Sequence, residues 1–444
     1  MDPKPRYTPS IAGEPSEGRG IPWTTQVMGR LTWPVRKLRR LPFWAYLAVL
    51  GPGIVSASAG NDAGGIATYS QVGAAYGYTL LWAMLIVTVG LMLVQEMCAR
   101  MGATTGKGLA DLIREEFGAR WALLAIAVLL IANTGVTISE FVGIAAVAGL
   151  FGVPGWLVVP PIALLVWWMV TNGSYRVVER VFMLISLVFV TYVVAAFLAG
   201  PDWGEVGKSF ITPSITFEPE MLQALVALIG TTITPYMQLF VQASVVEKGV
   251  TVRDYKYTRF DTVIGAILSN AVSIFIIIAT AATLHAAGTT NIESAADAAR
   301  ALEPVAGAGA TMLFALGLFG ASMLAAGVLP LATSFSVTEA LGFEKGVSLS
   351  FREAPVFMGL FTALLVIGAA VAMIPGLPLF PVLIAVQILN GALLPILLVF
   401  IVRLASNKRL MGKYAIGPLY RLLAWGTVAV ISTAVTLMFV TFFM

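Results

Sequence analysis

The sequence predicts an all-α integral membrane protein built from eleven membrane-spanning helices in two inverted halves. Three observations support this: the composition, the distribution of Lys and Arg, and two polar interruptions in matching spans. Of the 444 residues, 58% are hydrophobic and 11% are charged. Soluble domains carry about 25% charged residues. So few charges cannot cover a water-facing surface, so most of the chain is expected to face lipid or other helices.

A helix needs about 20 predominantly apolar residues to cross a bilayer. By this criterion the chain divides into a cytoplasmic N-terminal tail (1–44), a first five-helix repeat (45–199), a second, inverted repeat (220–403) and one additional transmembrane helix (419–443). The expected spans are 45–72, 78–101, 121–149, 154–172, 180–199, 220–247, 260–286, 308–341, 355–374, 379–403 and 419–443.

The basic residues test this count. With eleven spans, all but two of the 27 Lys and Arg residues fall on one side of the membrane, and the exceptions are Lys208 and Arg300. Cytoplasmic loops are enriched in Lys and Arg. We therefore expect a multi-pass protein of the cell (plasma or inner) membrane, with its N-terminus in the cytoplasm and its C-terminus outside.

Two spans are interrupted by polar and helix-weakening residues. The first contains GNDAGG (60–65), and the sixth contains GTTITP (230–235), in which Pro235 removes a backbone donor. The two spans are five apart, so they run in opposite directions through the membrane. Paired broken helices in inverted halves indicate the central site of a secondary transporter. The alternative is two ordinary kinks, since Gly and Pro are common in membrane helices.

The two interruptions offer only oxygen ligands. These are Asp62, freed backbone carbonyls, and hydroxyls such as those of Thr231 and Thr234. Oxygen ligands suit Mg²⁺, Ca²⁺ or Mn²⁺. Asp62 could instead cap a half-helix or pair with a base, but no Lys or Arg is expected deep in the first ten spans. We therefore favour a cation ligand.

Other classes of function find little support. A single His and a single Cys exclude a histidine-rich metal site and an intramolecular disulfide. No nucleophile–base pair or cofactor motif is visible, so an enzyme and a bound cofactor are not expected. The expected partners are a divalent metal ion as substrate and the lipid bilayer, with no nucleic acid and no obligate protein partner evident.

Several short segments together resemble the NRAMP family of divalent-metal transporters. That family carries Asp-Pro-Gly-Asn, an Ala-Thr pair and Tyr-Gly-Tyr in its first two helices, Met-Pro-His in helix 6, an acidic segment in helix 3, and Gln and Pro eight apart in helix 10. The resemblance implies a leucine-transporter-type 5+5 inverted repeat with broken helices 1 and 6. The matching residues here are Asp62-Ala63-Gly64-Gly65, Ala67-Thr68, Tyr76-Gly77-Tyr78, Thr234-Pro235-Tyr236, SEFVG (139–143), and Gln387 with Pro395.

In that family the metal is bound by the helix 1 Asp and Asn, the helix 6 Met, and a helix 6 carbonyl that corresponds to Thr231. Here the Asn is Gly65 and the Met is Thr234, which removes the soft ligand and widens the site. Mg²⁺ usually keeps several waters, which a wider site could hold. The departures resemble the NRAMP-related magnesium transporter branch. Gln387 could complete the ion's shell, or instead form an interhelical hydrogen bond.

The residues linked to proton coupling also differ. The helix 6 His of the family is Tyr236 here, which does not titrate near neutral pH, and an upstream Asp of helix 3 is Thr137. Glu140 is retained and could still carry protons. Asn61, before Asp62, could replace the lost Asn or cap the broken turn.

The resulting hypothesis is a secondary transporter that imports Mg²⁺, and Mn²⁺ beside it, as a partly hydrated ion by alternating access without proton coupling. Two alternatives stay open: a proton-coupled Mn²⁺/Fe²⁺ transporter and a cation-coupled symporter of an organic solute. Away from the site, Glu96 and Arg100 are expected to form a structural ion pair.

Overall fold

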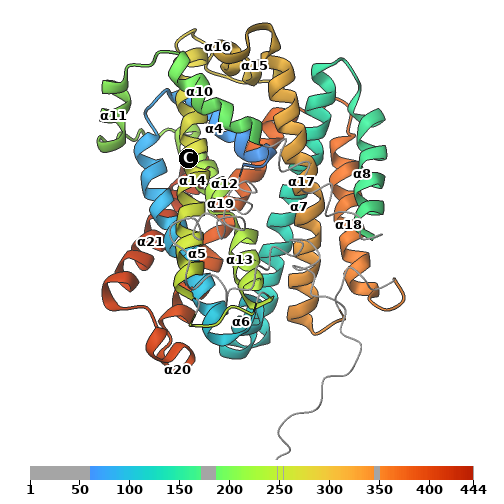
Figure 1. Ribbon diagram of the computed structural model, residues 1–444, viewed down its shortest axis with the longest axis vertical. Coiled ribbons are helices and arrows are strands. Elements are labelled where there is room, and N and C mark those ends of the chain that lie inside the picture. The colour runs from blue at the N-terminus through green and yellow to red at the C-terminus, as the bar shows by residue number, and fades with distance from the viewer. Residues whose placement is uncertain (1–60, 172–186, 248, 254, 345–350, 444) are drawn as a thin grey trace, which may run out of the picture.

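The computed structural model describes residues 61–171, 187–247, 249–253, 255–344 and 351–443, and within these ranges it contains helices and no strands (Figure 1). The predicted N-terminal tail and the first part of the first span lie outside the described residues. Eight described helices, some of them interrupted, are long and apolar enough to cross a membrane. They correspond to predicted spans 2, 3 and 6 to 11.

The bounds of these helices follow the apolar runs of the sequence. They are α5 (Leu81–Thr105), α7 (Ala119–Leu150), α12 (Pro219–Thr232) with α13 (Pro235–Glu247), α14 (Tyr255–Thr280) continued by the π-helical turn η3 (Ala281–His285), α17 (Ala310–Leu341), α18 (Pro355–Ala372), α19 (Leu379–Ser406) and α21 (Pro418–Phe443).

The other three predicted spans are represented by shorter helices. The fourth is α8 (Gly155–Thr171), an apolar helix of 17 residues. The first and fifth lie partly outside the described residues, and their described parts are α4 (Ala63–Tyr76) and α10 (Thr191–Leu198), which follows the short turn η2 (Leu187–Val190).

Short helices lie at both ends of the bundle. One end carries α6 (Leu109–Phe117) and α20 (Lys408–Met411) (Figure 1). We call it the basic end because Arg114 belongs to α6 and Lys408 and Arg409 belong to α20. The opposite end carries α11 (Trp203–Ile211), α15 (Ala295–Ala299) and α16 (Glu303–Ala306) (Figure 1). The short turns η4 (Arg300–Leu302) and η5 (Gly307–Gly309) flank α16 in the chain.

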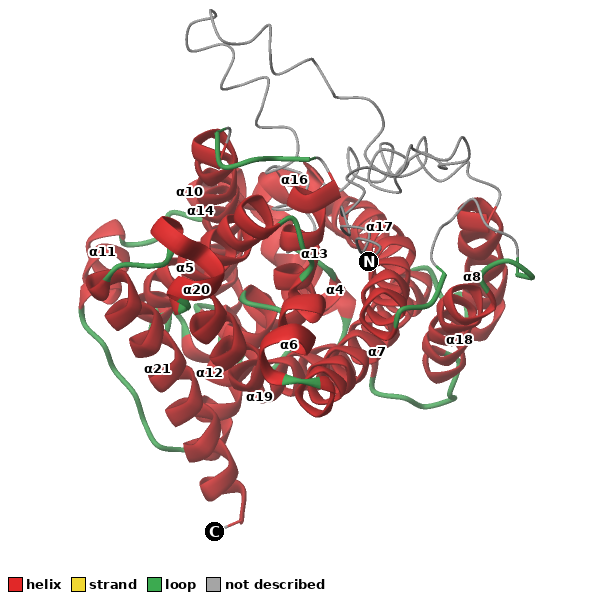
Figure 2. Cartoon of the chain, turned by 90° about the horizontal axis from the view of Figure 1, so that it is seen from below, coloured by secondary structure: helices red, strands yellow, loops and turns green. Residues whose placement is uncertain are grey.

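Helices five apart in the predicted order pack against each other. The described half of helix 1, α4, packs against α12, and α5 packs against α14. Likewise α7 packs against α17, and α8 against α18, which stand side by side at one edge of the bundle (Figures 1 and 2). The packing of these four pairs of counterpart helices agrees with the predicted five-plus-five inverted repeat. The additional helix α21 lies at the opposite edge, against α12 and α19.

Two glycines bring the backbones of α12 and α19 into contact. A Cβ on Gly230 would lie 2.1 Å from the carbonyl oxygen of Gln387, and one on Gly391 would lie 2.2 Å from the carbonyl oxygen of Val226. Any larger side chain would force these helices apart. The close approach places Gln387 of α19 directly beside the end of α12.

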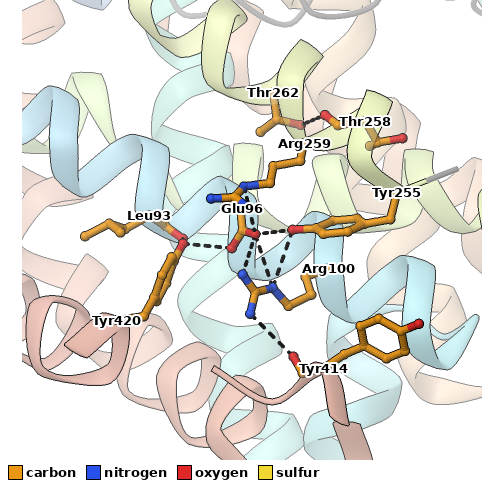
Figure 3. Close-up of polar contacts among 9 residues, drawn as sticks. All are labelled: Leu93, Glu96, Arg100, Tyr255, Thr258, Arg259, Thr262, Tyr414 and Tyr420. Carbon is orange, nitrogen blue, oxygen red and sulfur yellow. Dashed lines mark hydrogen bonds and ion pairs between the residues drawn. The ribbon is translucent and has the colours of Figure 1, made fainter. Parts of the chain in front are cut away.

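At the basic end, a buried carboxylate joins three helices (Figure 3). Glu96 of α5 is 2% exposed and accepts hydrogen bonds from Arg100, at 2.6 Å from Nη2 to Oε1, and from the hydroxyl of Tyr255 on α14. Its Oε2 accepts from the hydroxyl of Tyr420 on α21 at 2.8 Å, and Nε of Arg259 lies 3.6 Å from Oε1. The expected ion pair is confirmed, and it forms the centre of a larger group that we call the Glu96 cluster.

Candidate functional site

Helix 6 breaks where the sequence predicts. α12 ends at Thr232 and α13 begins at Pro235, so Ile233 and Thr234 lie between the half-helices. Proline cannot donate to the preceding turn, which accounts for the end of α12 at this point. The last carbonyls of α12 have no intrahelical donor, and Thr231 belongs to this last turn.

The break in helix 1 is described from Asn61 onward. Asp62 is the N-cap of α4, and its Oδ1 accepts a hydrogen bond from the backbone N–H of Gly65 at 2.6 Å. The carboxylate is 2% exposed, and no Lys or Arg is among the buried residues of the described part of the chain. The capping bond is therefore real, but it uses Oδ1 alone. It holds a buried carboxyl group at the break, and none of the buried residues that the structure describes is a Lys or Arg.

The two threonines predicted as ligands differ from the threonine between them in their hydrogen bonds. Thr231 and Thr234 are 1% and 0% exposed, and neither hydroxyl has a hydrogen-bond partner among the described residues. By contrast, the hydroxyl of Thr232 donates to the carbonyl of Leu228 at 2.7 Å and lies 3.0 Å from the hydroxyl of Tyr69. A buried polar group without a partner costs about 1–3 kcal/mol. An ion or its water ligands would remove this cost at both sites.

Gln387 lies against the helix 1 break. A Cβ on Gly64 would lie 2.0 Å from Nε2 of Gln387, so only glycine leaves room for the amide there. Its Oε1 accepts a hydrogen bond from Nδ2 of Asn390 at 2.9 Å, and its Nε2 has no partner among the described residues. The predicted alternative, an interhelical hydrogen bond, is therefore not the one observed, because the bond lies within α19.

Glu140 belongs to the same break. Its Oε2 accepts from the backbone N–H of Ala63 at 3.4 Å, and its Oε1 accepts from the hydroxyl of Ser139 at 3.3 Å. Both buried carboxylates, Asp62 and Glu140, thus contact the first turn of α4, whose N–H groups carry partial positive charge. Sequence reasoning missed this contact, because Glu140 is 77 residues from Ala63 and no local signal links them.

The remaining predicted residues are placed as follows. Oδ1 of Asn61 accepts from the hydroxyl of Ser273 on α14 at 3.2 Å, so Asn61 bridges two helices and Asp62 provides the cap. The interpretation of Asn61 as the capping residue is corrected accordingly. Tyr236 is 4% exposed in the first turn of α13, and the hydroxyl of Thr137 donates to the carbonyl of Asn133 in its own helix. Gly65 offers only backbone groups, and its N–H donates the hydrogen bond to Asp62 described above.

These groups suit a hard cation in transit better than a resident metal ion. Among the described residues, no three His, Cys, Asp or Glu side chains are grouped so that they could hold a metal ion. The breaks instead combine the Asp62 carboxylate with neutral hydroxyl and backbone oxygens, and the Gln387 amide lies beside them. Such ligands contact an ion or its waters without binding so tightly that the ion cannot leave.

Comparisons with known proteins agree with this architecture. Residues 53–441 match the family model of natural resistance-associated macrophage protein-like (Nramp) proteins. The divalent metal cation transporter MntH of Yersinia pestis (strain Pestoides F) is 28% identical over 389 residues, covering 86% of this chain and 90% of that protein. The protein of the same name from Ralstonia nicotianae is 29% identical over 415 residues, covering 89% and 91%.

Solved structures share the fold. The manganese transporter of Eremococcus coleocola, in complex with an aromatic bis-isothiourea substituted compound, has a TM-score of 0.69 at 21% identity and covers 90% of this chain and 87% of that one. MhsT in complex with L-phenylalanine has a TM-score of 0.56 at 14% identity, covering 88% and 98%. At these identities the likeness is one of fold alone.

Proposed function

Since this chain belongs to the Nramp family of natural resistance-associated macrophage protein-like proteins, we propose that it is a transporter of divalent metal cations that imports Mg²⁺, and Mn²⁺ beside it. The ions pass partly hydrated, by alternating access between the two sides of the membrane. The metal is then a transported substrate and not a cofactor, and the protein is not an enzyme. Relatives named as divalent metal cation transporters, and the manganese transporter that shares the fold, support this class of substrate.

One observation carries the proposal of Mg²⁺. The hydroxyls of Thr231 and Thr234 are buried without a partner among the described residues, at the break between α12 and α13. Thr234 stands where the resemblance places a methionine, so the soft ligand that would favour transition metals is replaced by a hydroxyl. Mg²⁺ dehydrates reluctantly. Hydroxyl oxygens serve it well, because they can accept hydrogen bonds from the waters that the ion keeps.

Each residue of the site has a distinct role in this scheme. Asp62 supplies the negative charge, held in place by its bond to Gly65. In this scheme Gly65, where the resemblance places an asparagine, leaves room for water, and Gln387 approaches the break from α19 beside Gly64. The N-terminus is then cytoplasmic and the C-terminus extracytoplasmic in the cell membrane, in accord with the positions of the basic residues.

The membrane potential alone supplies enough free energy to accumulate the ion without proton coupling. Two positive charges crossing a potential of about 100 mV gain roughly 4.6 kcal/mol, a concentration ratio above about a thousand. Tyr236 and Thr137 take the positions of two titratable residues of the resemblance, which further supports uncoupled transport.

The test is metal flux into proteoliposomes with the internal pH read at the same time. We expect Mg²⁺ to enter along a negative-inside potential and to compete with Mn²⁺ while the internal pH stays constant. Asp62→Asn serves as the control, because asparagine also caps a helix but carries no charge. Uptake of Mn²⁺ in which Mg²⁺ neither enters nor competes would rule out the proposed substrate.

The structure also favours a second candidate, a proton-coupled Mn²⁺/Fe²⁺ transporter. The observation is the position of Glu140, which contacts the same turn of α4 as Asp62. A carboxylate so close to the ion could release a proton when the ion binds. In the same flux experiment this candidate predicts acidification of the lumen that disappears in Glu140→Gln, whereas uncoupled uptake leaves the pH of both variants unchanged.

A further inference from the structure

Two glutamines of α13 are buried with free oxygens. Gln238 and Gln242 are both 0% exposed. Nε2 of Gln238 donates to the carbonyl of Thr234 at 3.4 Å, and Nε2 of Gln242 donates to the carbonyl of Lys107 at 2.9 Å. In both side chains, Oε1 has no hydrogen-bond partner among the described residues.

The orientation of these amides is fixed by their partners. A backbone carbonyl can only accept, so the amide nitrogen and not the oxygen must face Thr234 in one case and Lys107 in the other. Both oxygens must therefore point away from those bonds. Gln387 differs, because its partner Asn390 can donate or accept, and both amides could be turned without losing their hydrogen bond.

The free oxygens form a row that starts at the candidate site. Positions 234, 238 and 242 are four residues apart, and the hydroxyl of Thr234 is likewise without a partner. Gln238 and Gln242 both belong to α13, and at this spacing they share a helix face with a rise of about 6 Å between them. Thr234 lies immediately before the first turn of the same half-helix. The row ends at Gln242, whose partner Lys107 lies between α5 and α6 at the basic end (Figure 1).

Three acceptors in a row call for a common partner. Each buried acceptor without a hydrogen bond costs about 1–3 kcal/mol, and native proteins rarely leave such groups unsatisfied. Other buried positions of α13, such as Leu239 and Val241, carry apolar side chains that need no hydrogen-bond partner. The amides are therefore expected to bind something that the interior of the helix bundle alone does not supply.

We propose that Gln238 and Gln242 form a second, weaker binding site for the hydrated divalent cation, between the breaks and the basic end. Their oxygens accept hydrogen bonds from the waters that the ion carries, and the two amides themselves carry no charge. A neutral site of this kind lets the ion leave the breaks without trapping it on the way. The inference rests on the proposed function, because it assumes that a metal ion passes between the half-helices.

Crystals of the full chain soaked in Mn²⁺ test the site directly. We expect two anomalous peaks, one at the breaks and one about 4–5 Å from the amide oxygens, the distance of an ion that binds through one water. Asp62→Ala should remove the first peak and leave the second at high Mn²⁺ concentration. A single peak at the breaks in the wild type, with none near the glutamines, overturns the inference.

Transport by Gln238→Met/Gln242→Met provides the second measurement. Methionine has similar length but lacks the amide, so we expect the maximal rate of Mg²⁺ uptake to fall about tenfold, with KM changed less than about twofold. Gln95→Met is the matched control, a buried glutamine of α5 outside the row, and it should transport like the wild type. Size-exclusion chromatography checks that the double variant folds. If it does not fold, the anomalous peaks of the wild-type crystals still decide whether the glutamine site binds an ion.

The two hypotheses fail in different ways. Wild-type uptake of Mg²⁺ that is equally fast in the double variant, without a second peak, refutes the glutamine site and leaves the proposed function intact. Absence of uptake of either ion by the wild type refutes the proposed function, while the peaks still report whether the glutamines bind a cation.

Discussion

Thr234→Met is the sharpest test of how this site selects its ion. The hydroxyl of Thr234 is fully buried and has no partner among the described residues, so an ion or its water is free to use it. Methionine removes this acceptor and adds a thioether, a soft ligand that binds Mn²⁺ and Cd²⁺ better than Mg²⁺.

The expected size of the effect follows from the hydrogen bond that is lost. One hydrogen bond to a water polarised by Mg²⁺ is worth about 1.5 kcal/mol, so kcat/KM for Mg²⁺ should fall about tenfold. For Mn²⁺ the new sulfur ligand offsets this loss. The ratio of Mn²⁺ to Mg²⁺ transport should therefore rise by about tenfold or more.

The assay is competition between Mn²⁺ and Mg²⁺ for entry into proteoliposomes at a fixed membrane potential. Thr234→Val separates the two changes, because valine has the shape of threonine but neither hydroxyl nor sulfur. It should slow both ions and leave their ratio unchanged. If Thr234→Met also leaves the ratio unchanged, Thr234 does not contact the ion or its waters, and the argument for Mg²⁺ loses its main support.

Three further predictions follow from the contacts described above. Asp62→Ala and Asp62→Asn should both abolish uptake, but only the alanine should also lower stability, by about 1 kcal/mol, because asparagine keeps the cap; a transport-competent Asp62→Asn in a flux assay would show that the residue acts as a cap alone. In Asn390→Asp the new carboxylate can only accept a hydrogen bond, so Nε2 of Gln387 should turn toward it and Oε1 should turn toward the break. KM for Mg²⁺ should then fall about tenfold, whereas Asn390→Leu should raise KM. Shifts of KM in the same direction for both variants would contradict this account. Glu96→Ala removes the carboxylate that accepts from Arg100, Tyr255 and Tyr420, and it should destabilise the protein by about 2 kcal/mol in thermal unfolding, against about 1 kcal/mol for Tyr420→Phe. Melting temperatures equal to that of the wild type would mean that the cluster contributes nothing.

The fold was accessible from the sequence because its signals are local. Apolar length defines the spans, and Pro235 with its neighbouring threonines marks the break that the structure shows between Thr232 and Pro235. The inverted arrangement follows from counting five spans between two interrupted helices. The pairing of α7 with α17, and of α8 with α18, then agrees with the predicted repeat.

The site was less accessible, because its contacts join distant residues. Nothing in the spacing shows that Glu140 reaches Ala63, or that Gln387 fits only because Gly64 has no side chain. Asn61 and Asp62 are both good capping residues. Only the hydroxyl of Ser273, supplied by α14, shows why Asn61 bridges two helices while Asp62 caps α4.

The glutamine row was visible in the sequence but was not recognised. Two glutamines four residues apart in an otherwise apolar half-helix are a signal that polar groups share one buried face. What the spacing could not show is that their nitrogens are occupied by backbone carbonyls and their oxygens are left free. That distinction depends on where α5 and α6 lie beside α13.

The Glu96 cluster has a consequence for how the two halves could move against each other. α5 and α14, which are counterparts in the two halves, are joined to each other and to α21 by one buried carboxylate at the basic end. Nδ2 of Asn270 on α14 also donates to the hydroxyl of Thr88 on α5 at 2.8 Å. Any motion that separates α5 from α14 would have to break both contacts, so we expect these two helices to move together, with α21 attached to them.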